Sequence, residues 1–268
     1  MKDIIIVINS SNRIDKLRTF NKFPKDVIDW VVAIPKDQEE QYLEVVPKGR
    51  LLLIPENIQQ FLPSQRQYCT EYYLDKYKYI FFMDDDLTFF KRNKKLRLKK
   101  ASTKDVLKMF KLVRKTLNDY SMVGISTRLG NNCVEEDTAD TARVTRCYAF
   151  NLDTFKKVGA VFNPFEPFVA EDFHINLCFL NKGYNNRVIF KYAQEDIGSN
   201  AKGGCSLYRT PDVQKKTAYW MASNHPEVSV KVKKSANWNG FEGTRVDMVV
   251  HWKKAYKPRT KVKNRFLK

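Results

Sequence analysis

The 268-residue chain has no long hydrophobic run. No apolar stretch approaches the roughly 18–20 residues that a membrane-spanning helix needs. The apolar residues 4–8 near the N-terminus are too few for a signal peptide, and no small-residue cleavage site follows them. We therefore expect no membrane span, and we expect the first apolar segment to be a buried strand.

Paired cysteines and glycine-rich nucleotide motifs are also missing. The five cysteines are odd in number and form no CxxC pair, which predicts free thiols in a reducing cytoplasm and argues against a zinc site. They are Cys69, Cys133, Cys147, Cys178 and Cys205. Neither a Walker A nor a GxGxxG pattern occurs, which argues against a P-loop ATPase or a dehydrogenase.

Acidic residues are scarce in two stretches, and these stretches account for the whole net charge of +18. Residues 87–104 hold eight basic and no acidic residues, and residues 231–268 hold twelve basic and two acidic residues. Such localised charge predicts a surface for a polyanion, with nucleic acid as the first candidate and anionic lipid or acidic glycan as alternatives. The predicted contacts in the first stretch are Lys91, Arg92, Lys94, Lys95 and Arg97. In the second stretch, Trp238 would stack on an extruded base or, alternatively, pack the late strands.

Short apolar segments alternate with helical patterns along the chain. Strands are expected at residues 4–8, 30–34, 50–54 and 79–83, with later ones at 122–126, 143–150, 187–192, 228–232 and 246–252. Helices are expected at residues 64–77, 103–118, 170–181 and 211–223. This alternation predicts an α/β fold with a parallel sheet.

Three consecutive carboxylates follow the aromatic strand at 79–83. Asp84, Asp85 and Asp86 stand where the chain leaves the sheet, the usual position of ligand sites in open α/β sheets. Crowded carboxylates repel one another unless a cation neutralises them, and the spacing of Asp84 and Asp86 suits one hard cation such as Mg²⁺ or Mn²⁺. The alternative is an ordinary acidic turn.

The order of these features resembles the GT-A class of nucleotide-sugar glycosyltransferases. The shared features are the Ser/Asn/Arg turn after the first strand, the acidic triplet, the pair Glu171-Asp172 before a helix, and a late histidine. The resemblance covers residues 2–252 and is greatest to the branch associated with TET/JBP oxygenases and bacterial viruses. It implies a Rossmann-like, mixed but mostly parallel sheet flanked by helices. It also implies one domain at residues 1–256, with a donor-binding half (1–125), an acceptor half (126–256) and a basic tail (257–268).

The resemblance assigns donor and metal roles to particular residues. Mn²⁺ or Mg²⁺ would be held by Asp84 and Asp86, with a further ligand from His251 or, alternatively, His174; His225 is expected to be structural. The nucleotide-sugar donor would contact Asn9, Ser10, Ser11, Arg13, Gln65, Arg66, Asp84 and Asp85.

The resemblance also assigns the chemistry of the acceptor. Asp172 would be the base and Glu171 would orient the acceptor, although acids at a helix start are common for electrostatic reasons alone. Residues 196–209 would form a lid in which Lys202, Gly203 and Gly204 meet the acceptor, or else an ordinary solvated loop.

We therefore expect a metal-dependent enzyme that moves a hexose, with UDP-glucose as the expected donor, to a hydroxymethylated pyrimidine in double-stranded DNA. The alternatives are transfer to protein or cell-surface polysaccharide, a DNA-binding module without catalysis, and a metal-dependent nuclease. The sequence leaves the oligomeric state open.

Overall fold

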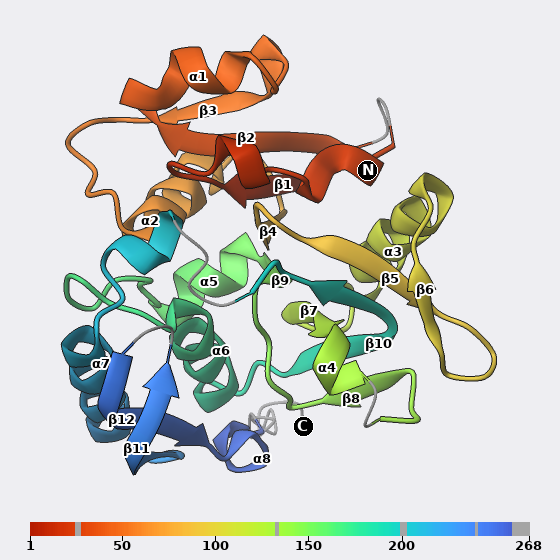
Figure 1. Cartoon of the computed structure of the whole chain (residues 1–268). Coiled ribbons are helices and arrows are strands. Elements are labelled where there is room, and N and C mark those ends of the chain that lie inside the picture. Colours follow the sequence, from red (N-terminus) through yellow and green to blue (C-terminus); the bar gives the residue numbers. More distant parts are fainter. Residues whose placement is uncertain (25–27, 132–133, 199–202, 239–240, 259–268) are drawn as a thin grey trace, which may run out of the picture.

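The chain forms one large mixed sheet with helices on both faces, together with a separate two-stranded hairpin (Figure 1). The computed structural model describes residues 1–24, 28–131, 134–198, 203–238 and 241–258, with the side chains of 235–238 and 241–242 left aside. The sheet confirms the predicted α/β class. Among the described residues, no helix is long and apolar enough to cross a membrane.

The large sheet is mostly parallel in strand direction. Its spatial order is β3 (Leu51–Ile54), β2 (Asp29–Pro35), β1 (Ile4–Asn9), β4 (Tyr79–Asp84), β9 (Cys147–Asn151), β7 (Met122–Thr127), β10 (Asn186–Glu195), β5 (Thr88–Arg92) and β6 (Leu98–Lys100), with β8 (Thr138–Asp140) also paired to β10. The first four run parallel, and β9 enters antiparallel between β4 and β7. In the β1–β4 pair Asn9 lies opposite Asp84, so the carboxyl ends of the two strands meet at one point.

Alternating side chains of the central strands face two hydrophobic cores. Ile4, Ile6 and Ile8 of β1 belong to one core, while Ile5 and Val7 belong to the other. A strand that is buried on both faces consists of consecutive apolar residues. For this reason the positions of β1 and β4 could be predicted from the sequence.

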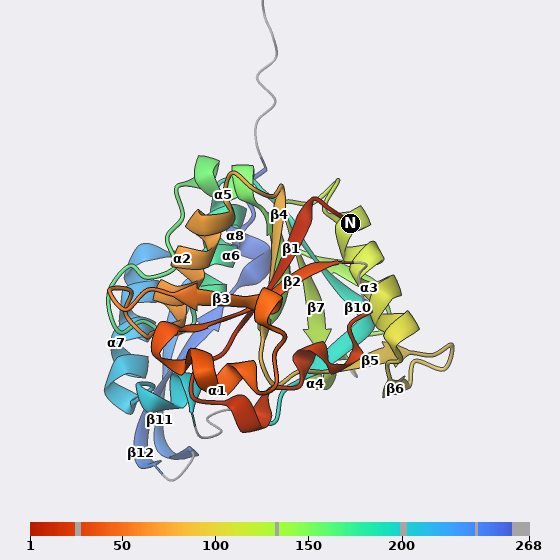
Figure 2. The same ribbon diagram turned by 90° about the horizontal axis from the view of Figure 1, so that it is seen from above.

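Helices cover each face of the sheet (Figure 2). The first core includes residues of α3 (Thr103–Thr116), and the second includes residues of α2 (Leu62–Tyr73), α5 (Leu152–Val158) and α6 (Glu171–Asn181). Ser102 and Asp105 form a capping box at the start of α3, as the sequence pattern predicted for a helix beginning there. The short elements are η1 (Ile14–Lys16), η2 (Thr19–Lys22), η3 (Lys36–Gln38), α1 (Glu39–Leu43), η4 (Lys48–Arg50), α4 (Arg128–Asn131) and η5 (Gly204–Leu207).

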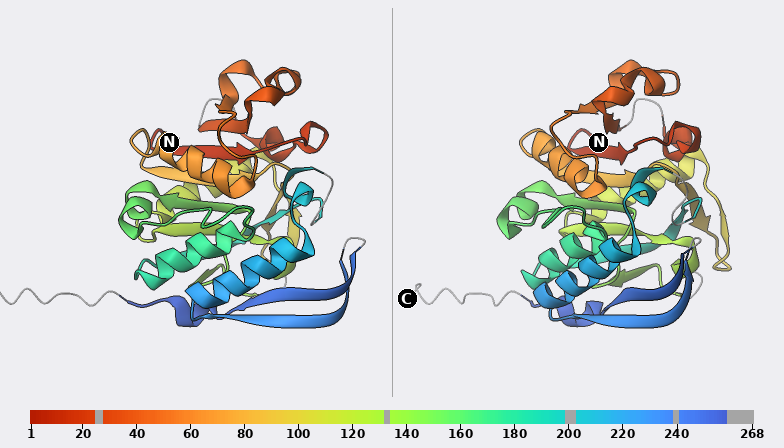
Figure 3. Two further views of the ribbon diagram at one scale, coloured as in Figure 1. Left: turned by 90° about the vertical axis from the view of Figure 1, so that its left-hand side faces the viewer. Right: turned by 60° about the vertical axis from the view of Figure 1, so that its left-hand side comes forward.

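The last part of the chain adds a smaller layer. Strands β11 (Val228–Trp238) and β12 (Phe241–Val250) form an antiparallel hairpin that packs against α7 (Pro211–Asn224). A third hydrophobic core joins this layer and α8 (Trp252–Ala255) to α6. Figure 3 shows that the end of β11 and the start of β12 lie well away from α8.

Three features differ from the expectation. The basic stretch 87–104 contains strands β5 and β6 in addition to its turn, because Phe89 and Phe90 are buried and β5 pairs with both β10 and β6. The polar segment 128–142, expected as a loop, contains α4 and β8. The two late strands are longer than predicted, because they pair with each other, from Val228 opposite Val250 to Trp238 opposite Phe241, as a separate two-stranded sheet.

Candidate active site

A cleft of about 560 Å³ opens at the carboxyl ends of β1 and β4, the edge at which open α/β sheets bind ligands. Its walls come from the turn after β1, the acidic triplet, the starts of α2 and α6, residues 203–209 and the hairpin. The sequence-predicted residues that line it are Asn9, Ser10, Ser11, Arg13, Gln65, Arg66, Asp84, Asp85, Asp86, Glu171, Asp172, Gly203 and Gly204.

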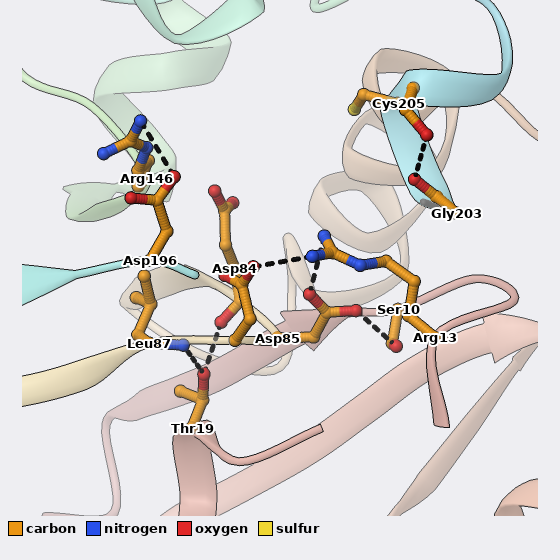
Figure 4. A network of polar contacts seen from close by, with 12 residues as sticks. Ser10, Arg13, Thr19, Asp84, Asp85, Leu87, Arg146, Asp196, Gly203 and Cys205 are labelled. Carbon is orange, nitrogen blue, oxygen red and sulfur yellow. Dashed lines mark hydrogen bonds and ion pairs between the residues drawn. The ribbon is translucent and has the colours of Figure 1, made fainter. Parts of the chain in front are cut away.

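Arg13 holds two of the three aspartates (Figure 4). Its guanidinium lies 3.1 Å from Asp85 and 2.6 Å from Asp86. Ser10 donates a hydrogen bond of 2.6 Å to the other oxygen of Asp85 and lies 2.7 Å from the Tyr42 hydroxyl. The turn after β1 therefore neutralises charge that the end of β4 brings together.

Arg66 joins the third aspartate to the opposite side of the cleft. Its guanidinium donates to Asp84 at 2.7 Å and to Glu171 at 2.5 Å, and it contacts the hydroxyl of Tyr148 at 3.3 Å. The side chain is only 1% exposed and lies 5.4 Å from the ring centroid of Phe82. A buried cation of this kind persists only when carboxylates pair with it, so Asp84, Arg66 and Glu171 form one electrostatic unit.

The backbone of the triplet is fixed from outside the sheet. The Thr19 hydroxyl donates to the carbonyl of Asp84 at 2.6 Å and accepts from the N–H of Leu87 at 2.9 Å. The N–H groups of Arg18 and Thr19 both donate to the carbonyl of Asp85. The carboxylates are thus presented by a turn with satisfied backbone groups.

Proton affinities in the cleft are raised by desolvation. Burial raises the pKa of Asp85 to about 7 against the opposing charge of Arg13, and burial also raises the pKa of Asp84 against that of Arg66. Burial likewise raises the pKa of Glu171 to about 7, with Arg66 opposing the shift. Perturbed carboxyl groups gathered in one cleft are typical of functional sites.

The side-chain oxygens beside the triplet are suitable ligands for a hard divalent cation. Among the described residues, one oxygen each of Asp84 and Asp86 accepts from an arginine, and no hydrogen bond is found for the second oxygen of either. The buried Oδ1 of Asn9, beside Asp84 in the register, also has no partner there. Mg²⁺ and Mn²⁺ favour such oxygen ligands and are commonly bound by one or two carboxylates plus substrate phosphates.

The pair Glu171-Asp172 begins α6 after a strained residue. Ala170 adopts a left-handed conformation with φ of 64°, which is unfavourable for a residue with a side chain. This conformation turns the first helical residues toward the cleft. Asp172 is half-buried and accepts from the N–H of Phe173 at 2.9 Å, while its charge also acts on Arg143.

Residues 203–209 pack against the turn after β1. The N–H of Gly204 donates to the carbonyl of Ser11 at 3.1 Å. Gly203 has φ of 94°, and a Cβ there would lie 2.5 Å from the carbonyl oxygen of Asn12. Glycine is therefore needed here because the backbone approaches the turn after β1, which belongs to the predicted donor-binding half. The sequence had instead predicted that the two glycines contact the acceptor.

The first basic stretch is not part of the cleft lining. Arg92, predicted to contact DNA, is 5% exposed, and its guanidinium donates to Asn131 and to carbonyls of the segment 134–136. This corrects the prediction, because the buried cation serves the packing of that loop. Lys91 pairs with Asp105 at 2.7 Å. The remaining predicted contacts, Lys94, Lys95 and Arg97, are exposed near the β5–β6 turn.

The structure does not bring His251 to the triplet, which corrects its prediction as a metal ligand. His251 is exposed, precedes α8, and its backbone N–H donates to the carbonyl of Glu227 at 2.9 Å. It is not among the described residues that line the cleft, although Val249, two residues earlier on β12, does line it. His174, the alternative ligand, is also outside that lining. Lys202 and the side chain of Trp238 lie outside the described residues.

Several cleft residues were missed by the sequence reasoning. Arg146 precedes β9, adopts a φ of 59° and pairs with Asp196 at 3.0 Å (Figure 4). The other basic members are Arg143, Arg209, Lys231, Lys233 and Arg245. The hairpin members lie within the second basic stretch, but only tertiary packing turns them toward the triplet.

Comparison with known proteins identifies related sequences and folds. A family model described as TET-Associated Glycosyltransferase matches residues 4–204. The crystal structure of GalNAc-T7 with UDP, GalNAc and Mn²⁺ is 12% identical with a TM-score of 0.53, covering 85% of this chain and 51% of that one. The structure of S. aureus TarS 1-349 in complex with UDP is 15% identical with a TM-score of 0.49, covering 82% of this chain and 65% of that one.

The family match and the similarity to GalNAc-T7 confirm the GT-A fold. At these identities the solved structures show the fold alone, and the chain spans between about half and two thirds of their lengths. No curated protein matches the chain.

Proposed function

Because the chain belongs to the TET-associated glycosyltransferase family, we propose that it transfers a hexose from a nucleoside diphosphate donor to the hydroxyl of a hydroxymethylated pyrimidine in DNA. The observation that carries the proposal is a single cleft that combines the acidic end of β4, the carboxylates of α6 and a basic rim. The donor half would be residues 1–125 and the acceptor half residues 126–256. The setting would be the cytoplasm, that of a host cell if the protein is viral.

The donor would occupy the side formed by β1, α2 and β4. Ser11, Arg13 and Gln65 line the cleft beside the triplet and present hydroxyl, guanidinium and amide groups to a nucleotide. UDP-glucose is the proposed donor, in keeping with the UDP found in the two similar structures. A Mn²⁺ or Mg²⁺ ion held by Asp84 and Asp86 would neutralise the charge that develops on the departing diphosphate.

Asp172 would act as the base in an inverting transfer. The acceptor oxygen forms a bond to the anomeric carbon while the bond from that carbon to the diphosphate oxygen breaks, and the acceptor proton passes to Asp172. The leaving nucleoside diphosphate takes the bonding electron pair. Glu171, paired with Arg66, would orient the acceptor rather than take its proton.

The basic rim supports a polyanionic acceptor. Lys231 and Lys233 are exposed on the hairpin and line the cleft, and the exposed Arg143 and the half-buried Arg209 line it as well. Lysine and arginine gain affinity for DNA by releasing its condensed counterions, and a target base must leave the helical stack to reach a cleft of this kind. The exposed turn of β5 and β6 would add a second, more distant contact to the duplex.

The proposal is tested by measuring UDP release from UDP-glucose in the presence of Mn²⁺. We expect turnover with DNA that contains hydroxymethylated pyrimidines, little with unmodified DNA, and loss of turnover in Asp86→Asn. The matched control is Asp119→Asn, which changes an exposed aspartate outside the cleft lining.

Each outcome of that experiment decides a different part of the proposal. Equal UDP release by wild type and Asp86→Asn would overturn the metal assignment. Transfer to a protein or polysaccharide acceptor at undiminished rate, with none to DNA, would keep the enzyme class and overturn the acceptor. Specific DNA binding without turnover of any nucleotide sugar would indicate a DNA-binding module.

A further inference from the structure

A compact group of nitrogen and sulfur ligands lies outside the cleft, where α6 meets the end of α7. His174 and Cys178 stand four residues apart on α6, and therefore on one face of that helix. His225 follows the last residue of α7. One ligand atom from each of the three residues lies within 4.8 Å of the other two, and none of the three residues is among the described residues lining the cleft.

The spacing of these atoms is close to that of a tetrahedral metal site. The Nδ1 of His174 lies 2.9 Å from Nε2 of His225 and 3.7 Å from the sulfur of Cys178. Around a zinc ion, two nitrogens lie about 3.3 Å apart and a nitrogen and a sulfur about 3.6 Å apart, given bonds of roughly 2.1 and 2.3 Å. Moving the two imidazole rings apart by about half an ångström would make room for the ion.

The surroundings hold the rings in a suitable orientation. His174 makes a hydrogen bond to the backbone of Val161, which occupies one ring nitrogen and leaves the other for a ligand bond. The ring of Trp220 packs edge-on against His174 at 5.2 Å and fixes its plane. The negative charge of the nearby Glu227 carboxylate acts on the His225 ring and raises its pKa, against the effect of burial.

Both imidazoles are held neutral by their burial. Desolvation lowers the pKa of His174 to about 3, with His225 lowering it further, and desolvation also lowers the pKa of His225. Neutral imidazole is the form that coordinates metals. Burial raises the pKa of the Cys178 thiol to about 12, so the thiol must lose its proton when a metal binds.

We propose that His174 Nδ1, Cys178 Sγ and His225 Nε2 bind one Zn²⁺ ion, with the fourth position taken by water through the half-buried side of Cys178. Binding releases the thiol proton to solvent, and the metal replaces the proton shared between His174 Nδ1 and His225 Nε2, which moves to the second nitrogen of the imidazole that carries it or to solvent. The ion would fasten α6 to α7. Since α6 begins with Glu171 and Asp172, the site would stabilise the helix that presents the proposed base, without touching the reaction.

The test uses the full-length chain, freed of metal with a chelator and then titrated with Zn²⁺ or Co²⁺. We expect about one Zn²⁺ bound per chain and, with Co²⁺, the thiolate charge-transfer absorption that only a cysteine ligand produces. Both signals should disappear in Cys178→Ser and persist in Cys205→Ser, a matched change of another half-buried cysteine. Zn²⁺ should raise the Tm of the wild type and leave that of Cys178→Ser unchanged.

Two results would overturn the proposal. One is the absence of the thiolate absorption at every Co²⁺ concentration, which would leave the two histidines as a hydrogen-bonded pair without metal. The other is unchanged Zn²⁺ binding by Cys178→Ser, which would place the ion at other ligands, such as the acidic triplet. His225→Gln, with folding checked by circular dichroism, provides a second variant that should lose the same signals.

Discussion

The two walls of the cleft handle charge in opposite ways. On the wall built by β1 and β4, each aspartate of the triplet is paired with Arg13 or Arg66, and Asp85 and Asp86 are buried. On the wall built by α6 and the hairpin, Asp172 is half-buried, and Lys231 and Lys233 are exposed, with Lys233 lying 3.1 Å from Asp247 at the surface. A wall with internally balanced charge suits a small ligand that brings its own cation. A wall with exposed charge suits a large polyanion that arrives from solvent.

The largest expected effect is a fall in kcat. Whether kcat or the KM for the donor changes tells the two walls of the cleft apart. Asp172→Asn should lower kcat by about 10²–10⁴-fold, the range for loss of a general base, while the KM for the donor stays within about twofold of the wild type. Steady-state rates with varied UDP-glucose provide the measurement. A rise in donor KM larger than the fall in kcat would move Asp172 to the donor side.

The next effect concerns Arg66, which links the walls. Arg66→Met leaves Asp84 and Glu171 without their shared cation, and removing one member of a buried charge group destabilises a protein by about 3–5 kcal/mol. Urea unfolding should report a loss of this size. Arg50→Met is the control, since Arg50 is a partly exposed arginine outside the cleft lining. Similar stability of the two variants would contradict the bridging role.

A smaller effect is expected where residues 203–209 touch the donor wall. Gly203→Ala would force a Cβ against the carbonyl of Asn12 at a positive φ, a cost of about 1–3 kcal/mol in a strained conformation. Donor affinity, measured by calorimetry, should fall together with Tm. Gly49→Ala, where an added Cβ meets nothing within 4 Å, should leave both unchanged.

The exposed wall is tested through salt dependence. Lys231→Ala combined with Lys233→Ala should weaken DNA binding and reduce the slope of log affinity against log salt by about 0.9 for each lost phosphate contact. Lys94→Ala combined with Lys95→Ala should reduce the slope less, since that turn is not part of the cleft lining. An equal or larger change in the second variant would assign the acceptor to the β5–β6 turn instead.

The smallest effect is a pH dependence of stability. The pKa of Glu171 is raised to about 7 in the folded protein, so the folded state holds a proton that the unfolded state has lost between about pH 4.5 and 7. The metal-free protein should therefore lose stability as pH rises through this window. Glu171→Gln should show a shallower decline in chemical unfolding at several pH values, and an unchanged decline would remove Glu171 as its source.

The sequence correctly predicted those features of the fold that depend on local residue patterns. The continuous apolar runs located β1 and β4, and the position of the triplet after β4 located the cleft, because the carboxyl ends of adjacent parallel strands must meet. The helix that begins at Glu171 was likewise predicted within one residue.

Long-range partners account for most of what the sequence could not predict. Arg92 looked like a surface cation, and only its contact with the loop around Asn131 buries it. Arg66 was expected to attract an anionic ligand, yet its partners are two carboxylates of the protein itself, one of them 105 positions away in sequence. The spacing of His174 and Cys178 was visible in the sequence, but the place of His225 beside them depends on how α7 packs.

The bridge made by Arg66 has a consequence for the order of events. One guanidinium is shared between Asp84 of one wall and Glu171 of the other. A cation that draws Asp84 away would leave Arg66 to act more strongly on Glu171, and the protonation of Glu171 must in turn alter the affinity for that cation by the same factor. The cation at Asp84 and the proton on Glu171 would thereby be coupled through Arg66, so that the arrival of the donor with its cation would prepare the cleft for the acceptor.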